Sequence, residues 1–239
     1  MDATVLQHFA PFTLSSACYA AGYSVGLGAF AWMAHRRRLW TSGMIRLMAA
    51  GLIGGLVFAN LAQLIFAHEP GKSVLGALAG GYLVVAIYKR RLGIRRATGD
   101  LFAVALSAGE AVGRFGCLFG GCCYGRATAM PWAIAQHGAM RHPTQLYLAA
   151  ASAAILAVLL VLERRRPPEN TLFYVQGVLY CTARFTIEFF RDTSTLALGL
   201  TSAQWACIAG VAFFGTMLAR LRQVEAARAG GTASEAATA

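Results

Sequence analysis

Seven apolar runs, separated by short polar or basic segments, constrain this chain more than any other feature. A helix that crosses a membrane needs roughly 20 mostly apolar residues, with about 17 to 25 tolerated, and its backbone must satisfy its own hydrogen bonds in lipid. The runs predict an all-α polytopic membrane protein with seven transmembrane helices, at residues 12–34, 44–67, 73–88, 98–115, 144–162, 171–190 and 201–219.

The composition supports this prediction. Hydrophobic residues make up 57% of the 239 positions and charged residues only 13%, whereas about a quarter of a soluble domain is charged. The net charge of +11 would also suit a protein that binds nucleic acid. The basic residues, however, form short clusters between apolar runs, as in loops that stay in the cytoplasm. We therefore expect a lipid bilayer around the chain and no nucleic-acid partner.

The basic residues also predict the orientation. With the N-terminus outside and the C-terminus inside, 15 of the 21 Lys and Arg residues lie in inside segments, at positions 36–38, 46, 89–91, 95, 96, 164–166, 220, 222 and 228. A bias of this kind sets membrane topology. We expect a single seven-helix membrane domain over residues 1–222 and a disordered cytoplasmic tail over residues 223–239, which are mostly Ala, Gly, Ser and Thr.

Residues 113–147 interrupt the helical pattern and are predicted to form a glycine- and cysteine-rich outer loop between helices four and five. Glycine permits close backbone approach and suits a non-helical segment that lines a cavity at membrane depth. An ordinary surface loop is the alternative. At the end of the loop we expect His142 and Pro143 to enter the next helix and Gln145 to point back toward the loop.

Charged residues in or beside the apolar runs are candidates for function, because they are costly in lipid. Arg184, Glu188 and Arg191 share one helical face, and Glu110 precedes Arg114 by four residues. In one interpretation these charges simply neutralise one another. In the other, one positive charge is left over, because Glu188 faces the two guanidiniums of Arg184 and Arg191. If the outer ends of the two helices converge, the arginines form an anion pocket for a phospholipid headgroup, because a guanidinium binds phosphate in a bidentate manner.

Three of the six cysteines gather in the outer loop, at Cys117, Cys122 and Cys123. On the oxidising side of a membrane Cys117 could form a disulfide with either of the other two, and a thiol with covalent chemistry is a further alternative. The spacing lacks the paired CxxC motifs typical of metal sites, so we expect neither a metal nor a cofactor. The other cysteines lie in apolar runs, where a free thiol packs as a small hydrophobic group.

Three motifs, in this order, resemble those of the prolipoprotein diacylglyceryl transferases: GRFGCLFGGCCYGR at 113–126, HPTQLY at 142–147 and RFTIEFFR at 184–191. The resemblance extends over most of the chain. It implies an enzyme of the bacterial cytoplasmic (inner) membrane that moves the diacylglyceryl group of phosphatidylglycerol onto the lipobox cysteine of a preprolipoprotein and releases glycerol 1-phosphate. A related membrane enzyme for another phospholipid or acceptor, or a non-catalytic protein that binds or transports phospholipid, are the alternatives.

The resemblance also implies roles for individual residues. Arg114, Arg184 and Glu188 match the catalytic positions of the family, and Arg114 would hold the lipid phosphate. The positions expected to bind substrate are Arg191, Gly116, Gly125, His142, Gln145, Tyr147, Tyr19 and Tyr23.

The chain departs from the family pattern at several positions. Cys117 replaces an asparagine and Cys122 an acidic residue, while Leu56 and Leu148 replace an arginine and an acidic residue. The run Lys72–Gly76 lacks the histidine that the family places before glycines as a proposed base. The roles of those counterparts therefore do not carry over to this chain.

Overall fold

The computed structural model describes residues 3–67 and 74–237. They divide into two compact units, one formed by Met1–Ala29 with Thr98–Ala239 and the other by Phe30–Ala97. The segment that lacks the expected histidine falls partly at residues 72–73, outside the described residues.

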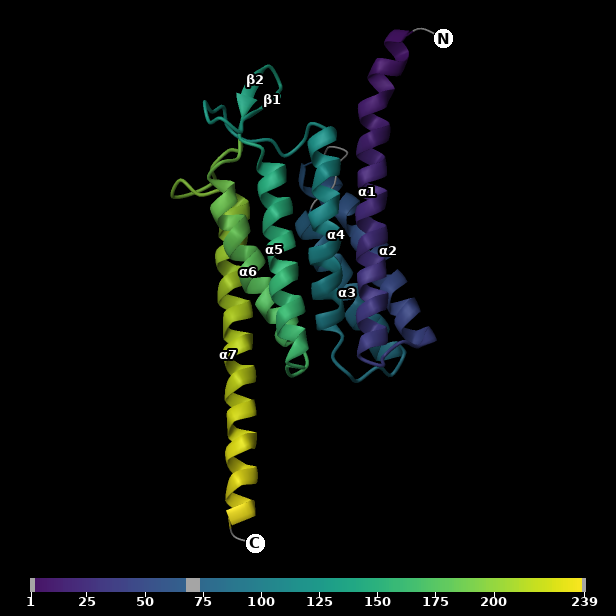
Figure 1. The fold of residues 1–239 in the computed structure, drawn as a ribbon, viewed down its shortest axis with the longest axis vertical. Coiled ribbons are helices and arrows are strands. Elements are labelled where there is room, and N and C mark those ends of the chain that lie inside the picture. The colour runs from purple at the N-terminus through teal and green to yellow at the C-terminus, as the bar shows by residue number, and fades with distance from the viewer. Residues whose placement is uncertain (1–2, 68–73, 238–239) are drawn as a thin grey trace. The chain divides into compact units, whose positions relative to one another are not determined.

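The described residues form seven helices and one hairpin of two short strands (Figure 1). The elements, in chain order, are α1 (Ala3–Arg36), α2 (Ser42–Ala67), α3 (Val74–Arg91), α4 (Gly99–Phe119), β1 (Ile134–Gln136), β2 (Ala139–Arg141), α5 (Thr144–Arg164), α6 (Thr171–Glu188) and α7 (Ser202–Ala237). Each of the seven predicted runs therefore overlaps one helix, and the helical prediction is confirmed.

Four of the helical segments are long and apolar enough to cross a membrane, namely Ser42–Leu61, Gly99–Phe119, Thr144–Arg164 and Ser202–Ala227. This supports a membrane protein. The crossing of the membrane by α1, α3 and α6, and the orientation of all seven helices, remain predictions.

In the larger unit, α4 packs against α5 and α6, α5 packs against α6, and α6 packs against α7. The strands β1 and β2 are antiparallel, with Ile134 opposite Arg141. The hairpin lies beyond the end of α4 and before the start of α5, at one end of this unit (Figure 1). The short sheet lies within the predicted outer loop and was not part of the all-α prediction.

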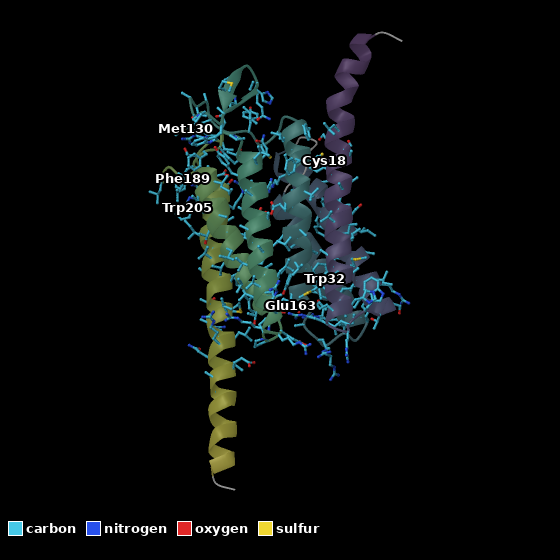
Figure 2. The ribbon with its side chains drawn as sticks, in the orientation of Figure 1. Cys18, Trp32, Met130, Glu163, Phe189 and Trp205 are labelled. Atoms are coloured by element: carbon cyan, nitrogen blue, oxygen red, sulfur yellow. The ribbon has the colours of Figure 1, made fainter. Side chains whose placement is uncertain are left out.

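Exposed apolar side chains mark the same end of the larger unit. Met130, Phe189 and Trp205 are 47%, 49% and 37% exposed, and Figure 2 labels them near the hairpin and the adjoining helix ends. Glu163 is buried nearer the opposite end of α5. Exposed aromatic and sulfur-containing side chains of this kind suit a lipid environment.

The smaller unit is built on close contact between α2 and α3. A Cβ atom at Gly80 would lie 2.0 Å from Cβ of Phe58, and one at Gly54 would lie 2.7 Å from Cβ of Val84. The small residues therefore let the two helices approach closely, as is common for helices in membranes.

The last helix continues through Ala237 and includes most of residues 223–239, for which a tail is predicted. The division of the chain into a membrane domain and a disordered tail remains a prediction.

Candidate functional site

The outer loop and the segment after α6 are joined by backbone hydrogen bonds. Arg126 N donates to the carbonyl oxygen of Phe190 at 2.8 Å, and Gly125 N donates to that of His142 at 3.1 Å. The Arg141 guanidinium donates to Gly125 O at 3.1 Å and pairs with Asp192 at 2.7 Å. These bonds hold the C-terminal ends of α4 and α6 and the start of α5 around one site.

Glu110 gathers partners from three helices. It forms an ion pair with Arg114 on α4, accepts a hydrogen bond from Tyr180 Oη of α6 at 3.0 Å, and accepts one from Ser152 Oγ of α5 at 3.0 Å. Arg114 is only 9% exposed. Its guanidinium is therefore held in one orientation by a carboxylate and a phenol before any ligand binds.

On α6, Glu188 holds an arginine in the same way. The residue is 3% exposed, and its carboxylate pairs with Arg184. It also accepts hydrogen bonds from Thr193 Oγ1 at 3.2 Å and Thr201 Oγ1 at 3.1 Å. The shared helical face that the sequence predicts is confirmed for Arg184 and Glu188. For Arg191 the prediction is wrong, because α6 ends at Glu188 and Arg191 instead pairs with Gly125 in a β-bridge.

Arg191 is only partly satisfied by this cluster. Its Nη1 lies 3.6 Å from Glu188 Oε2, and its Nε is buried without a hydrogen-bond partner among the described residues. The arginine cluster, defined as Arg114, Arg184 and Arg191, thus contains three guanidiniums against the two carboxylates of Glu110 and Glu188. One positive charge and one buried donor are left for an anion.

The three loop cysteines lie together beside the arginine cluster. Their Sγ atoms are all within 4.8 Å of one another, and all three thiols are free. Hydrogen bonding with Cys117 and Cys122, followed by the positive charges of Arg191 and Arg114, lowers the pKa of the Cys123 thiol. Hydrogen bonding with Cys117 raises the pKa of Cys122. The disulfide that the sequence leaves open is not formed in the structure.

Tyr19 and the two motif glycines are placed by close packing. A Cβ at Gly116 would lie 2.9 Å from the Tyr19 ring, and one at Gly125 would lie 2.5 Å from His142 O. Tyr19 Oη donates to Cys117 Sγ at 3.2 Å. Tyr23, one turn along α1, is 41% exposed. Glycine at these two motif positions lets Tyr19 and the HPTQLY segment reach the loop.

The start of α5 joins the loop through side chains. Helix α5 begins at Thr144, so the prediction that His142 and Pro143 enter the helix is wrong; Pro143 is its N-cap residue. Gln145 Nε2 donates to Cys122 O at 2.8 Å, as expected for a side chain that points back to the loop. Tyr147 Oη lies 3.1 Å from His142 Nδ1. Leu148 is buried at 1% exposure and adds no charge.

Sequence reasoning missed Tyr180, Ser152 and Thr201. Each supplies a hydroxyl to Glu110 or Glu188 from a different part of the chain. A polar residue within an apolar helix is a weak signal that a buried charge lies nearby, but only the packing of the helices shows which charge it serves.

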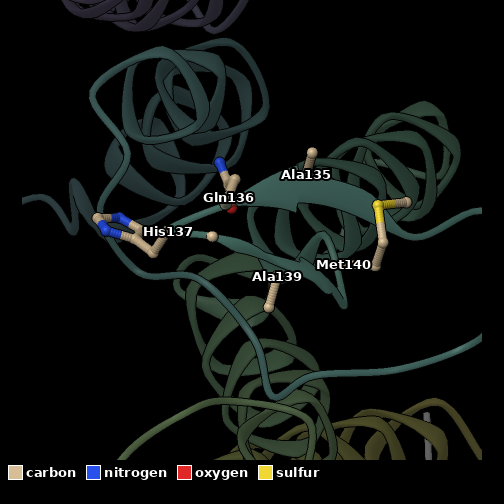
Figure 3. A pocket seen from close by; sticks show the side chains of 6 residues that line it. Ala135, Gln136, His137, Ala139 and Met140 are labelled. Atoms are coloured by element: carbon tan, nitrogen blue, oxygen red, sulfur yellow. The ribbon is translucent and has the colours of Figure 1, made fainter.

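A pocket of about 320 Å³ lies at the β1–β2 hairpin (Figure 3). Its walls include Gln136 and His137, and no member of the arginine cluster lines it. Gln136 Oε1 accepts a hydrogen bond from Gln145 Nε2 at 3.2 Å, which connects the hairpin to α5. The pocket is therefore connected to the start of α5 and separate from the arginine cluster.

The comparison with known families adds to this geometry. A model of the prolipoprotein diacylglyceryl transferase family matches residues 5–220. The chain belongs to this family. The match confirms the resemblance carried by the three motifs, and it includes every residue of the arginine cluster and all three loop cysteines.

Curated relatives carry the same family name. The phosphatidylglycerol–prolipoprotein diacylglyceryl transferase of Aromatoleum aromaticum is 31% identical over 200 residues, 75% of each chain. That of Idiomarina loihiensis is 31% identical over 68% of this chain and 67% of its own. That of Methylibium petroleiphilum is 31% identical over 81% of this chain and 87% of its own. The protein is thus a member of a transferase family of lipoprotein biosynthesis, with apolar helices that suit a membrane enzyme.

Proposed function

We propose that this protein transfers the diacylglyceryl group of phosphatidylglycerol to the lipobox cysteine thiol of a preprolipoprotein, in the bacterial cytoplasmic membrane. Glycerol 1-phosphate is the product that leaves. The names of its relatives support both substrates. The observation that carries the proposal is Arg191, which shares Glu188 with Arg184 and whose buried Nε lacks a hydrogen-bond partner among the described residues.

The reaction suits a site that is rich in arginine. The acceptor sulfur forms a bond to the glycerol carbon of the lipid, and the bond from that carbon to the phosphate oxygen breaks. The electron pair leaves with the phosphate, and the thiol gives up its proton. Because negative charge grows on the leaving phosphate, preorganised guanidiniums stabilise the transition state more than the ground state.

The two largely buried ion pairs supply the preorganisation. Glu110 with Tyr180 holds Arg114, and Glu188 holds Arg184. Since these carboxylates already fix the guanidiniums, little reorganisation is needed when charge develops. The nucleophile comes from the acceptor, so the enzyme needs to bind, orient and activate that thiol.

The test measures transfer from phosphatidylglycerol to a lipobox peptide in detergent micelles, by the mass of the lipidated peptide. We expect Arg114→Ala and Arg184→Ala each to lower the rate by about 100-fold or more, the usual loss for one preorganised donor. Arg220→Ala removes the same charge from an exposed position of α7 and should transfer normally. Arg114→Lys and Arg184→Lys keep the charge but not the planar fork, and they should give intermediate rates.

Complementation of a strain depleted of its own transferase tests the same proposal in cells. Growth with the native chain, and none with Arg184→Ala at equal membrane levels, supports the proposal. Unchanged transfer by both alanine variants would overturn it. Transfer by the native chain from another phospholipid, with none from phosphatidylglycerol, would instead favour a related enzyme with a different donor.

A further inference from the structure

The three loop cysteines, Cys117, Cys122 and Cys123, form a compact group that the proposed transfer has not yet used. The spacing along the chain argued against a metal, because paired CxxC motifs are absent. In the folded chain, however, the three sulfurs lie close together. The chain turns sharply after α4, where Cys122 N donates to Cys117 O at 3.1 Å, and brings all three Sγ atoms within 4.8 Å of one another.

We propose that these three thiolates bind one zinc ion and leave its fourth position for the thiol of the acceptor. The inference rests on the proposed function. Zinc takes thiolate ligands at about 2.3 Å in a tetrahedron, which places sulfurs roughly 3.8 Å apart. The observed group needs to contract by less than about 1 Å to reach that geometry. Three protein ligands with one open position are the arrangement of catalytic zinc rather than structural zinc.

Neighbouring side chains hold the ligands in place. Gln145 Nε2 donates to Cys122 O at 2.8 Å, and Thr144 Oγ1 donates to Cys123 O at 2.7 Å. Tyr19 Oη donates to Cys117 Sγ at 3.2 Å and lies 3.8 Å from Cys122 Sγ. Outer partners of this kind orient metal ligands and tune the metal.

The backbone of the turn is unusual at the third ligand. Cys123 has a φ of +59°, in the left-handed region that residues with side chains rarely adopt. Gly121, two residues earlier, has a φ of +66°. A residue held in this region often belongs to a functional site, where the surrounding structure maintains the conformation. Here the bond from Thr144 to Cys123 O helps maintain it, and the turn keeps Cys123 within reach of the other two sulfurs.

The charge around the group also suits thiolates. Three thiolates and one divalent zinc ion carry a net charge of −1. Arg191 and Arg114 both act on Cys123 with their positive charge, so they offset the negative charge of the loaded site. The same two arginines belong to the cluster proposed to hold the lipid phosphate, which places the acceptor sulfur and the lipid in one site.

Zinc would also supply the deprotonation of the acceptor thiol. The proposed transfer needs the acceptor thiol to lose its proton before its sulfur attacks the lipid carbon. A thiol that coordinates zinc loses its proton outright. The acceptor thiol would release its proton to solvent on binding, and its sulfur would then form the bond to the lipid carbon. The carbon–oxygen bond breaks, its electron pair leaves with the phosphate, and zinc returns to its starting state.

The test begins with metal content rather than activity. The full chain, purified in detergent with a mild reductant and a zinc buffer, should hold one zinc per chain by elemental mass spectrometry. Cys117→Ser, Cys122→Ser and Cys123→Ser should each hold less than a tenth of that. Cys18→Ser, a cysteine of α1 outside the group, should bind zinc normally. Tyr19→Phe should bind zinc about 10- to 100-fold more weakly, the usual effect of losing an outer partner.

Cobalt in place of zinc gives a spectroscopic signal for the fourth coordination position. The cobalt-substituted chain should show thiolate-to-cobalt absorption in the near ultraviolet, and a lipobox peptide should change its visible bands as a fourth sulfur binds. The same peptide with serine in place of cysteine should leave the bands unchanged. If a serine variant fails to fold, the native chain stripped by a chelator and reloaded with zinc gives the same comparison.

The outcomes separate this inference from the proposed function. Absence of bound zinc under these conditions, or a disulfide within the group in its place, overturns the zinc site. Full transfer by the zinc-free native chain overturns it as well and leaves the proposed function intact. Stoichiometric zinc and a peptide-dependent cobalt spectrum, without transfer from phosphatidylglycerol, would support the zinc site and overturn the proposed function.

Discussion

The contact between α1 and α4 provides the sharpest test of how packing builds the site. A Cβ atom at Gly22 would lie 2.8 Å from Cα of Gly113 and 2.9 Å from O of Gly109. Both are backbone atoms, so no side chain can move aside. Since carbon atoms in contact prefer about 3.5–4.0 Å, Gly22→Ala forces the helices apart by roughly 1 Å. Overpacking of this kind costs about 1–3 kcal/mol.

A second glycine on the same helix gives a matched control. A Cβ at Gly28 would meet no atom within 4 Å. Each substitution gains the same helix propensity, about 0.8–1.0 kcal/mol, so that gain cancels when the two variants are compared. We expect Gly22→Ala to be about 1–3 kcal/mol less stable than Gly28→Ala, as measured by unfolding in mixed micelles titrated with sodium dodecyl sulfate.

The same shift should reach the site. Tyr19 lies three residues before Gly22 and donates to Cys117 Sγ at 3.2 Å, a bond that a displacement of roughly 1 Å would break. Gly22→Ala should therefore also lower transfer and weaken zinc binding, whereas Gly28→Ala should change neither. Equal stability and equal activity of the two variants would refute the close approach of α1 to α4.

Substitutions at two further positions test the buried carboxylates of Glu188 and Asp100. Glu188→Ala leaves the largely buried Arg184 without its partner and should lower the free energy of unfolding by about 3–5 kcal/mol in the same titration. Glu188→Gln should lower it less, because the amide still accepts hydrogen bonds; equal losses would contradict the charge pairing. Asp100→Ala should lower the free energy of unfolding by about 1–3 kcal/mol, because the Asp100 carboxylate accepts hydrogen bonds from Asn170 N at 3.1 Å and Phe173 N at 3.0 Å. Hydrogen exchange should then rise at the start of α6, and unchanged protection there would refute the cap.

Local patterns predicted the helices and the ion pairs within them. An apolar run between two polar segments predicts a helix over residues 144–162. Helix α5 extends over Thr144–Arg164. The pairs Glu110–Arg114 and Arg184–Glu188 follow from residues four apart on one helix. Such features depend on positions close in sequence, so periodicity is sufficient to find them.

Features that join distant segments could not be predicted in this way. Asp100 of α4 caps the first turn of α6, about 70 residues later. Tyr180 of α6 donates to Glu110 of α4. Nothing in the local pattern of either helix indicates these bonds, since they depend on which faces of α4 and α6 meet. The short hairpin β1–β2 escaped prediction because three-residue strands show too little alternation.

The site combines two parts that arise from the chain in different ways. Two members of the arginine cluster, Arg114 and Arg184, come from helix periodicity, because each lies one turn from its carboxylate. The group of three cysteines instead depends on a turn, in which Gly121 and Cys123 adopt positive φ. Gln145 holds this turn through its hydrogen bond to Cys122 O. A substitution in the turn can therefore change the proposed zinc site while the helices keep the proposed anion site in place. This separation would allow a member of the family to carry Cys122, where the resemblance implies an acidic residue, and still retain the proposed anion site.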